Sequence, residues 1–324
     1  MPELGANAVL ALSVAAMVAG LFLLIKGGDW TIESAAFVAE RTGLSPLFIG
    51  ATIISFGTSV PELFASVNAN LSGYPGIALG NVLGSNVANI LLVLGATAFI
   101  FRITAKRDQI AKDMGMMLLA TGILAVGMLT DGFTRLFGLG MFVILVGFVA
   151  YQYRTDSLVV EDQDDDDAEE GKISSIRTAL LFLLAGLVFL AAGAELLVEG
   201  AVRTGSAIGV PEAVIGITVV AFGTSLPELS TCIAAARNQS VGLILGNIIG
   251  SNTFNILSII GVTAMIKPLA VDPVLLGGMD LWAMIAVTLA FAVWMMTIGR
   301  LTRATGVIMM IAYVGFVWAQ FTFI

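Results

Sequence analysis

The chain has 324 residues, of which 58% are hydrophobic and only 12% are charged, and its formal net charge is −8. Soluble domains carry about 25% charged residues, so this composition excludes an ordinary soluble globule and predicts a polytopic membrane protein. The chain has no histidine and one cysteine. This excludes Ser-His and Cys-His catalytic sites, histidine-based metalloprotease motifs and an intrachain disulfide.

Apolar segments long enough to span a membrane follow one another along the chain. A helix needs about 20 apolar residues to cross a bilayer. We expect spans at 5–25, 44–70, 77–100, 112–130, 133–152, 176–197, 209–236, 242–266, 274–297 and 304–323. No basic segment precedes the first span, so no cleavable signal peptide is expected. The sequence thus predicts an all-α membrane protein with ten transmembrane helices, divided into a first half (1–152), a linker (153–175) and a second half (176–324).

The linker is strongly acidic between Glu161 and Glu170, where it reads EDQDDDDAEE. Like charges repel, so we interpret it as an extended, solvated connector, with weak calcium sensing or a binding role as the alternative. Lysine and arginine accumulate in cytoplasmic loops. An outside N-terminus puts twelve of the 15 basic residues inside and leaves only Arg135, Arg203 and Lys267 outside. Both termini are therefore expected outside, and the linker in the cytoplasm.

Residues 50–95 are repeated at 216–261. GATIISFGTSVPEL and GNVLGSNVANI return as GITVVAFGTSLPEL and GNIIGSNTFNI after a shift of 166 residues, and 21 of 46 positions are identical. With five helices per half, the second copy enters the membrane from the opposite side, which gives an inverted repeat. Secondary transporters use such repeats, with broken helices meeting near the membrane midplane. The repeat continues more faintly in Asp29 and Glu195, which we expect near helix ends, either as interfacial charges or in a vestibule.

One acid stands alone in each copy of the repeat. Glu62 is the only charged side chain between residues 44 and 70, and Glu228 is the only one between 213 and 236. An ionised residue deep in a span costs at least about 2.5–3.5 kcal/mol and usually marks an ion path or a buried partner. Neither motif contains a basic partner. Pro61 and Pro227 should break both helices and free backbone carbonyls, so a bound cation is the best explanation.

Further oxygen donors share the helical faces of these acids. Ser55, Thr58 or Ser59 lie on the face of Glu62, and Asn81, Ser85 and Asn89 follow at intervals of four, with the second copy matching. Hard cations such as Ca²⁺ take about 6–8 oxygen ligands. The alternative is that these polar residues and the GxxxG pairs at Gly80 and Gly246 only pack helices together. We favour ligands for most of them and leave Asn86 and Asn252 undecided.

The motifs GTSVPE with GNVLGSNVANI, and GTSLPE with GNIIGSNTFNI, closely resemble the signature repeats of the cation/calcium antiporter superfamily, in particular its sodium/calcium exchanger branch. The resemblance to compact prokaryotic members implies a ten-helix inverted repeat in the cytoplasmic membrane of a prokaryote. It implies exchange of Na⁺ for Ca²⁺, conventionally three for one, without a cofactor, a protein partner or nucleic acid. The implied ion ligands are Thr58, Ser59, Glu62, Ser85, Asn89, Thr224, Ser225, Glu228, Ser251 and Asn255, with the backbone carbonyls of Ser55 and Ala221.

One departure from the resemblance concerns the choice of ion. Members that cotransport potassium carry an aspartate where this chain has Asn255, so we expect exchange that is independent of K⁺. Exchange of Ca²⁺ for H⁺ stays open, because other branches use the same paired glutamates with protons. A cation channel is a weaker alternative. An intramembrane protease built on Ser59 or Ser225 lacks a histidine or lysine base.

Overall fold

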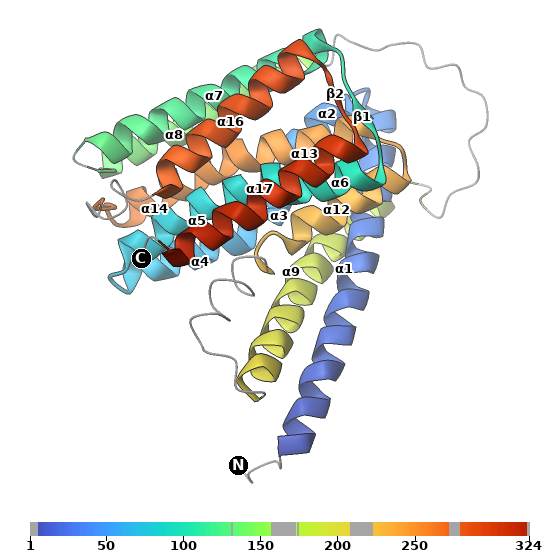
Figure 1. Ribbon diagram of the computed structural model, residues 1–324. Helices are drawn as coiled ribbons and strands as arrows, with labels where there is room; N and C mark the ends of the chain where they lie inside the picture. Colours follow the sequence, from blue (N-terminus) through green and yellow to red (C-terminus); the bar gives the residue numbers. More distant parts are fainter. Residues whose placement is uncertain are drawn as a thin grey trace.

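The computed structural model describes residues 6–130, 132–156, 173, 175–207, 223–271 and 279–322, and nearly all of them are helical (Figure 1). The first half contains α1 (Ala6–Thr42), α2 (Pro46–Ile49), the π-helix η1 (Gly50–Ile54), α3 (Ser55–Thr58), α4 (Val60–Leu71), α5 (Pro75–Ala88), the π-helix η2 (Asn89–Leu94), α6 (Gly95–Ile100), β1 (Ile103–Thr104), α7 (Arg107–Leu129) and α8 (Arg135–Asp156). The second half contains α9 (Ile176–Ala207), α12 (Leu226–Arg237), α13 (Val241–Phe254), the π-helix η4 (Asn255–Ile260), α14 (Gly261–Ile266), α16 (Met279–Thr297), β2 (Arg300–Leu301) and α17 (Arg303–Thr322).

These helices confirm the expected membrane architecture. Within the described residues, eight helices are long and apolar enough to cross a bilayer, and a ninth span consists of 46–58 and 60–71, bent by 44°. The remaining predicted span, 209–236, is described only from residue 223 and ends in α12. The fold is thus an all-α polytopic membrane protein, with a broken helix where Pro61 predicted one.

The first and sixth spans are longer than the sequence indicated. Helix α1 has 37 residues and α9 has 32, whereas a straight crossing of the hydrocarbon core needs about 20. We had expected Asp29 near a helix end, but it lies inside α1. The charged residues after Lys26 signal the edge of the apolar segment, but the backbone stays helical because α1 continues to pack against α9 and α12.

The two halves interlock with the symmetry that the duplication predicts. The fifth helix of each half packs on the third of the other half at a pair of glycines. A Cβ on Gly138 of α8 would lie 2.5 Å from the carbonyl oxygen of Gly261, and one on Gly306 of α17 would lie 2.5 Å from that of Gly95. Likewise β1 pairs with β2, and an equivalent bridge joins Phe133 and Leu269. These reciprocal contacts make the two halves one structural unit.

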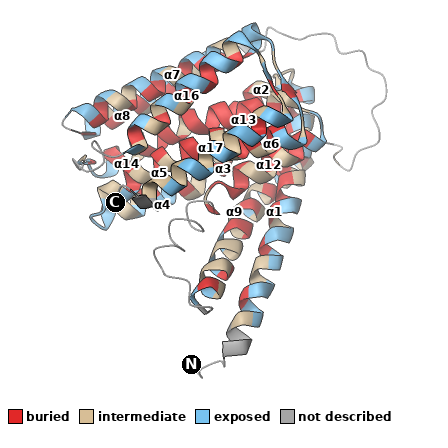
Figure 2. Ribbon diagram, viewed as in Figure 1, coloured by how far each residue is buried: buried red, intermediate tan, exposed pale blue. Residues whose placement is uncertain are grey.

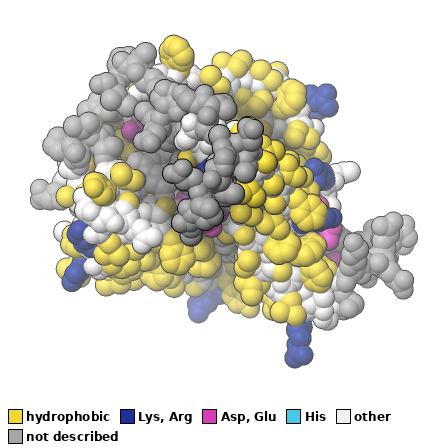
Figure 3. Space-filling model, turned by 90° about the horizontal axis from the view of Figure 1, so that it is seen from below, with side chains coloured by type: hydrophobic (Ala, Val, Ile, Leu, Met, Phe, Trp, Pro, Cys, Tyr) yellow, Lys and Arg dark blue, Asp and Glu magenta, His cyan; other side chains and the backbone are white. Residues whose placement is uncertain are grey.

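Burial separates a core from a surrounding scaffold (Figure 2). The span Val241–Ile266 is fully buried over its most apolar window, whereas the window in α17 is 6% buried. Many large hydrophobic side chains of the described residues are exposed. Hydrophobic side chains dominate the face in Figure 3, and most of the Lys and Arg side chains in view lie near its edges. The polar side chains inside the core therefore need a reason other than contact with water.

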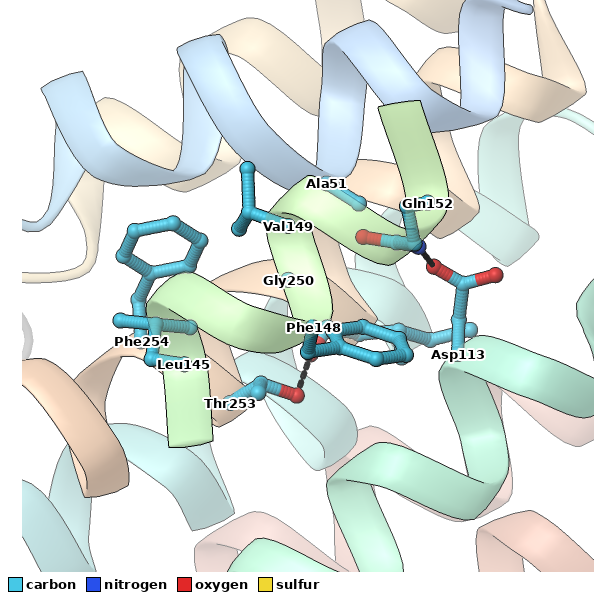
Figure 4. A pocket seen from close by; sticks show the side chains of 10 residues that line it. Ala51, Asp113, Leu145, Phe148, Val149, Gln152, Gly250, Thr253 and Phe254 are labelled. Atoms are coloured by element: carbon cyan, nitrogen blue, oxygen red, sulfur yellow. Dashed lines mark hydrogen bonds between the residues drawn. The ribbon is translucent and has the colours of Figure 1, made fainter. Parts of the chain in front are cut away.

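The scaffold helices of each half are joined by a carboxylate and an amide. Gln152 of α8 donates a hydrogen bond to Asp113 of α7, beside a small cavity that reaches Gly250 and Phe254 of the core (Figure 4). In the second half Gln320 of α17 donates to Asp280 of α16. The sequence analysis did not predict this pair. The structure shows that the pair recurs in both halves and ties the fourth helix to the fifth.

Replacing Gly250 by alanine tests the close contact between the halves. A Cβ at Gly250 would lie 2.5 Å from the carbonyl oxygen of Ala51, so we expect Gly250→Ala to destabilise the fold by about 1–3 kcal/mol. The thermal unfolding midpoint in detergent measures this. Gly115→Ala on α7 is the control, because no atom outside the adjoining turns of its own helix lies within 4 Å of its added Cβ. Equal midpoints for both variants would contradict the tight packing of α13 on the first half.

Candidate cation site

Two helix breaks with the same geometry define the site. Ser59 separates α3 from α4 with φ −88° and ψ 1°, and Ser225 precedes α12 with φ −88° and ψ 5°. Pro61 and Pro227 each occupy the first turn of the following helix, where a missing N–H costs nothing. The break that Pro61 predicted is therefore present in the first half, and the described residues of the second half show the same turn at Ser225 before α12.

Each break brings a glutamate into the first turn of a helix. Glu62 lies in the first turn of α4 and Glu228 in that of α12, and they are 1% and 0% exposed. The positive end of a helix dipole favours a carboxylate at this position. Helix α12 also contacts α3, which ends directly before the break at Ser59. Two buried negative charges in a membrane need a counter-charge, and a bound cation would supply it.

Unpaired polar atoms gather around these acids. Thirteen buried side-chain nitrogen and oxygen atoms of the described residues have no hydrogen-bond partner, and eight of them belong to six predicted ligands. These are Ser59, Glu62, Asn89, Ser225, Glu228 and Asn255. An unpaired buried polar group costs about 1–3 kcal/mol, so such a concentration is not expected of a purely structural core. Apart from the Asn89 amide nitrogen, the eight are oxygens, which are the ligands that Na⁺ and Ca²⁺ use.

A π-helix begins at the asparagine of each repeat. Helix η2 starts at Asn89 and η4 starts at Asn255, which are equivalent positions, and both asparagines are fully buried. Single π-turns inside α-helices occur frequently at functional sites because they reorient the side chains and carbonyls of one turn. A third π-helix, η1, precedes the break at Ser59. The sequence analysis assumed a uniform α-helical period and did not predict these turns.

Hydrogen bonds across the repeats bring the predicted residues together. The Asn255 amide donates to Ser85 Oγ at 3.1 Å and to Asn86 Oδ1 at 3.3 Å. Ser55 Oγ donates to the Asn247 carbonyl at 3.0 Å. The equivalent of Asn255 in the first half, Asn89, makes no such bond. The two halves of the site are therefore not identical, since one asparagine joins the repeats and the other is unpaired.

Asn81 and Asn247 support the glutamates through their amide nitrogens. Asn81 Nδ2 lies 3.2 Å from the Glu62 carbonyl and 2.9 Å from Ser66 Oγ. Asn247 Nδ2 lies 3.5 Å from the Glu228 carbonyl and 2.8 Å from Thr231 Oγ1. The sequence analysis grouped both with the oxygen donors of their helices. In the structure they hold the first turn of α4 and α12 in place.

The structure shows different amounts of detail for the remaining predicted ligands. The Ser55 carbonyl accepts the Ser59 N–H at 3.1 Å and Thr58 Oγ1 at 3.4 Å, and Ser251 Oγ donates to Asn247 Oδ1 at 3.4 Å. Thr224 is half-buried beside Ser225. Ala221 lies outside the described residues. No group of three or more Asp, Glu, His or Cys converges within the part of the chain that the structure describes. The formal charge at this centre therefore comes from Glu62 and Glu228.

Comparison with known proteins agrees with this geometry. A family model described as "Sodium/calcium exchanger protein" matches residues 12–154 and 178–322. The chain belongs to this family. It is 34% identical to the inner membrane protein YrbG of Escherichia coli over 87% of this chain and 88% of that protein. It is 29% identical to the sodium/calcium exchanger MaX1 of Methanosarcina acetivorans over 93% of this chain and 96% of that protein.

A solved structure extends the family similarity to the fold. The sodium-calcium exchanger NCX_Mj, soaked with 100 mM Na⁺ and 10 mM Sr²⁺, matches 94% of this chain and 97% of its own length. The TM-score is 0.80 and the sequence identity is 30%. The similarity therefore extends over nearly the whole length of both chains and not only over the signature motifs.

Proposed function

We propose that this protein exchanges Na⁺ for Ca²⁺ across the membrane by alternating access. The observation that carries the proposal is the cluster of unpaired buried oxygens around Glu62 and Glu228, where the two halves meet. The proposed ligands are the side chains of Thr58, Ser59, Glu62, Ser85, Asn89, Thr224, Ser225, Glu228, Ser251 and Asn255, with the carbonyls of Ser55 and Ala221.

Charge balance indicates electrogenic exchange. One Ca²⁺ would neutralise the two carboxylates, whereas three Na⁺ would leave the site with a charge of about +1. Each net charge moved would then feel about 2.3 kcal/mol per 100 mV of membrane potential. Asn255 adds no third carboxylate, which favours transport without K⁺. In the proposed topology both termini face outward and the 153–175 linker lies in the cytoplasm of a prokaryote, between a first half at 1–152 and a second at 176–324.

Purified protein in sealed liposomes tests the exchange. An outward Na⁺ gradient is expected to drive uptake of external Ca²⁺, and an inside-negative potential is expected to slow it, because three positive charges leave for two that enter. Replacing internal Na⁺ by K⁺ should abolish uptake. Uptake driven equally by a pH gradient without Na⁺ would instead establish H⁺/Ca²⁺ exchange, and Ca²⁺ flux that needs no counter-ion would establish a channel.

A further inference from the structure

Helices α1 and α9 form a symmetric pair beside the core. They run antiparallel and approach closely at glycines: a Cβ on Gly20 would lie 2.6 Å from the Gly193 carbonyl oxygen, and one on Gly27 would lie 2.7 Å from that of Gly186. The repeat relates Gly20 to Gly186 and Gly27 to Gly193, so these contacts obey the twofold symmetry of the halves. The α1/α9 pair is therefore symmetric, because exchanging the two halves leaves its glycine contacts unchanged.

The contacts of this pair with the core do not obey that symmetry. Ser230 Oγ of α12 donates a 2.5 Å hydrogen bond to the Leu24 carbonyl of α1. Gly28 allows the approach, because a Cβ there would lie 2.8 Å from Ser230 Oγ. One turn further along α1, Asp29 lies 3.6 Å from Arg237 at the end of α12. A hydrogen bond and an ion pair thus hold α1 on the glutamate-bearing helix of the second half.

The equivalent positions in the other half cannot form these bonds. Ser230 corresponds to Phe64 and Arg237 corresponds to Leu71, and these hydrocarbon side chains on α4 are 64% and 54% exposed. Glu195 of α9, the equivalent of Asp29, has no arginine at the matching place. The hydrogen bond and the ion pair therefore join α1 to α12, and the side chains at the equivalent positions of α4 cannot join it to α9 in the same way.

We propose that Ser230–Leu24 and Asp29–Arg237 form a one-sided latch that holds the α1/α9 pair against α12 and so favours the conformation closed on that side. The proposal rests on the proposed alternating access, in which the pair must also occupy the mirror-related position, against α4. Reaching that position breaks both latch bonds and forms no equivalent. In the proposed topology the latched side faces the cytoplasm. The latch therefore favours the conformation of the ion-free transporter whose site is open to the outside.

Hydrogen–deuterium exchange of the full-length protein in detergent tests the latch independently of transport. We expect Asp29→Asn combined with Ser230→Ala to speed exchange in α12 and to slow it in α4, because the α1/α9 pair spends more time on α4. The side chains are partly exposed, so a shift of roughly three- to tenfold in the conformational equilibrium is expected. Simple destabilisation would instead speed exchange in both helices.

Two further variants complete the test. Glu195→Gln, the counterpart of the Asp29 change, should leave exchange in both helices unchanged. Phe64→Ser combined with Leu71→Arg would place a mirror latch opposite Leu190 and Glu195, and it should protect α4 at the expense of α12. Faster exchange in both helices of the Asp29→Asn/Ser230→Ala variant, or no change in either, would overturn the latch. Neither outcome would contradict the proposed Na⁺/Ca²⁺ exchange, which the liposome measurements test separately.

Discussion

Glu62→Gln and Glu228→Gln are each expected to lower Na⁺-driven Ca²⁺ uptake into liposomes by at least about a hundredfold, which corresponds to about 2.8 kcal/mol of lost binding free energy. Each amide keeps the size of the side chain but removes half of the negative charge that faces the cation. Both carboxylates are buried, so water cannot compensate for the loss. The measurement is the initial rate of Ca²⁺ uptake at several external concentrations.

Folding and transport must be separated in this experiment. Removing one of two repelling buried carboxylates should not destabilise the ion-free protein, so the thermal midpoint without ions is expected to be unchanged or higher. The increase of the midpoint on adding Ca²⁺ should disappear, because stabilisation by a ligand follows its affinity. Glu33→Gln, an exposed acid of α1, is the matched control. Normal uptake by either glutamate variant would show that the ions bind elsewhere.

The two equivalent asparagines should respond differently to alanine. Asn89→Ala removes an amide with no hydrogen-bond partner among the described residues. We therefore expect the external Ca²⁺ concentration for half-maximal uptake to rise about tenfold, with no loss of stability in the ion-free protein. Asn255→Ala also removes the hydrogen bonds to Ser85 and Asn86. This variant should also lower the free energy of unfolding of the ion-free protein by about 1–3 kcal/mol, which a lower thermal midpoint would report.

Two measurements on both variants test this prediction. Ca²⁺ dependence of uptake and the ion-free midpoint are measured for both variants in the same detergent and lipid. If Asn89→Ala and Asn255→Ala lost the same stability, the asymmetry of the hydrogen bonds would be contradicted. If neither weakened the Ca²⁺ dependence, the two asparagines would be structural and not ligands.

The sequence by itself determined the membrane class, the duplication and the helix breaks. These are properties of composition and of short-range geometry: long apolar segments must be helical in lipid, and Pro61 and Pro227 cannot continue a helix. The lone acids Glu62 and Glu228 were recognisable for the same reason, because an unpaired charge in an apolar segment is costly wherever the segment packs.

Only the tertiary structure decided which polar atoms are left free at the site. Asn81 and Asn89 lie on one helix face in the sequence, yet Asn81 supports the Glu62 carbonyl and Asn89 is unpaired, because the neighbours of each are set by long-range packing. The π-turns, the length of α1 and the contact of Asp29 with Arg237 likewise depend on partners far away in the chain. A duplicated sequence predicts two equivalent halves, whereas a single folded conformation can satisfy the equivalent contacts differently in each half.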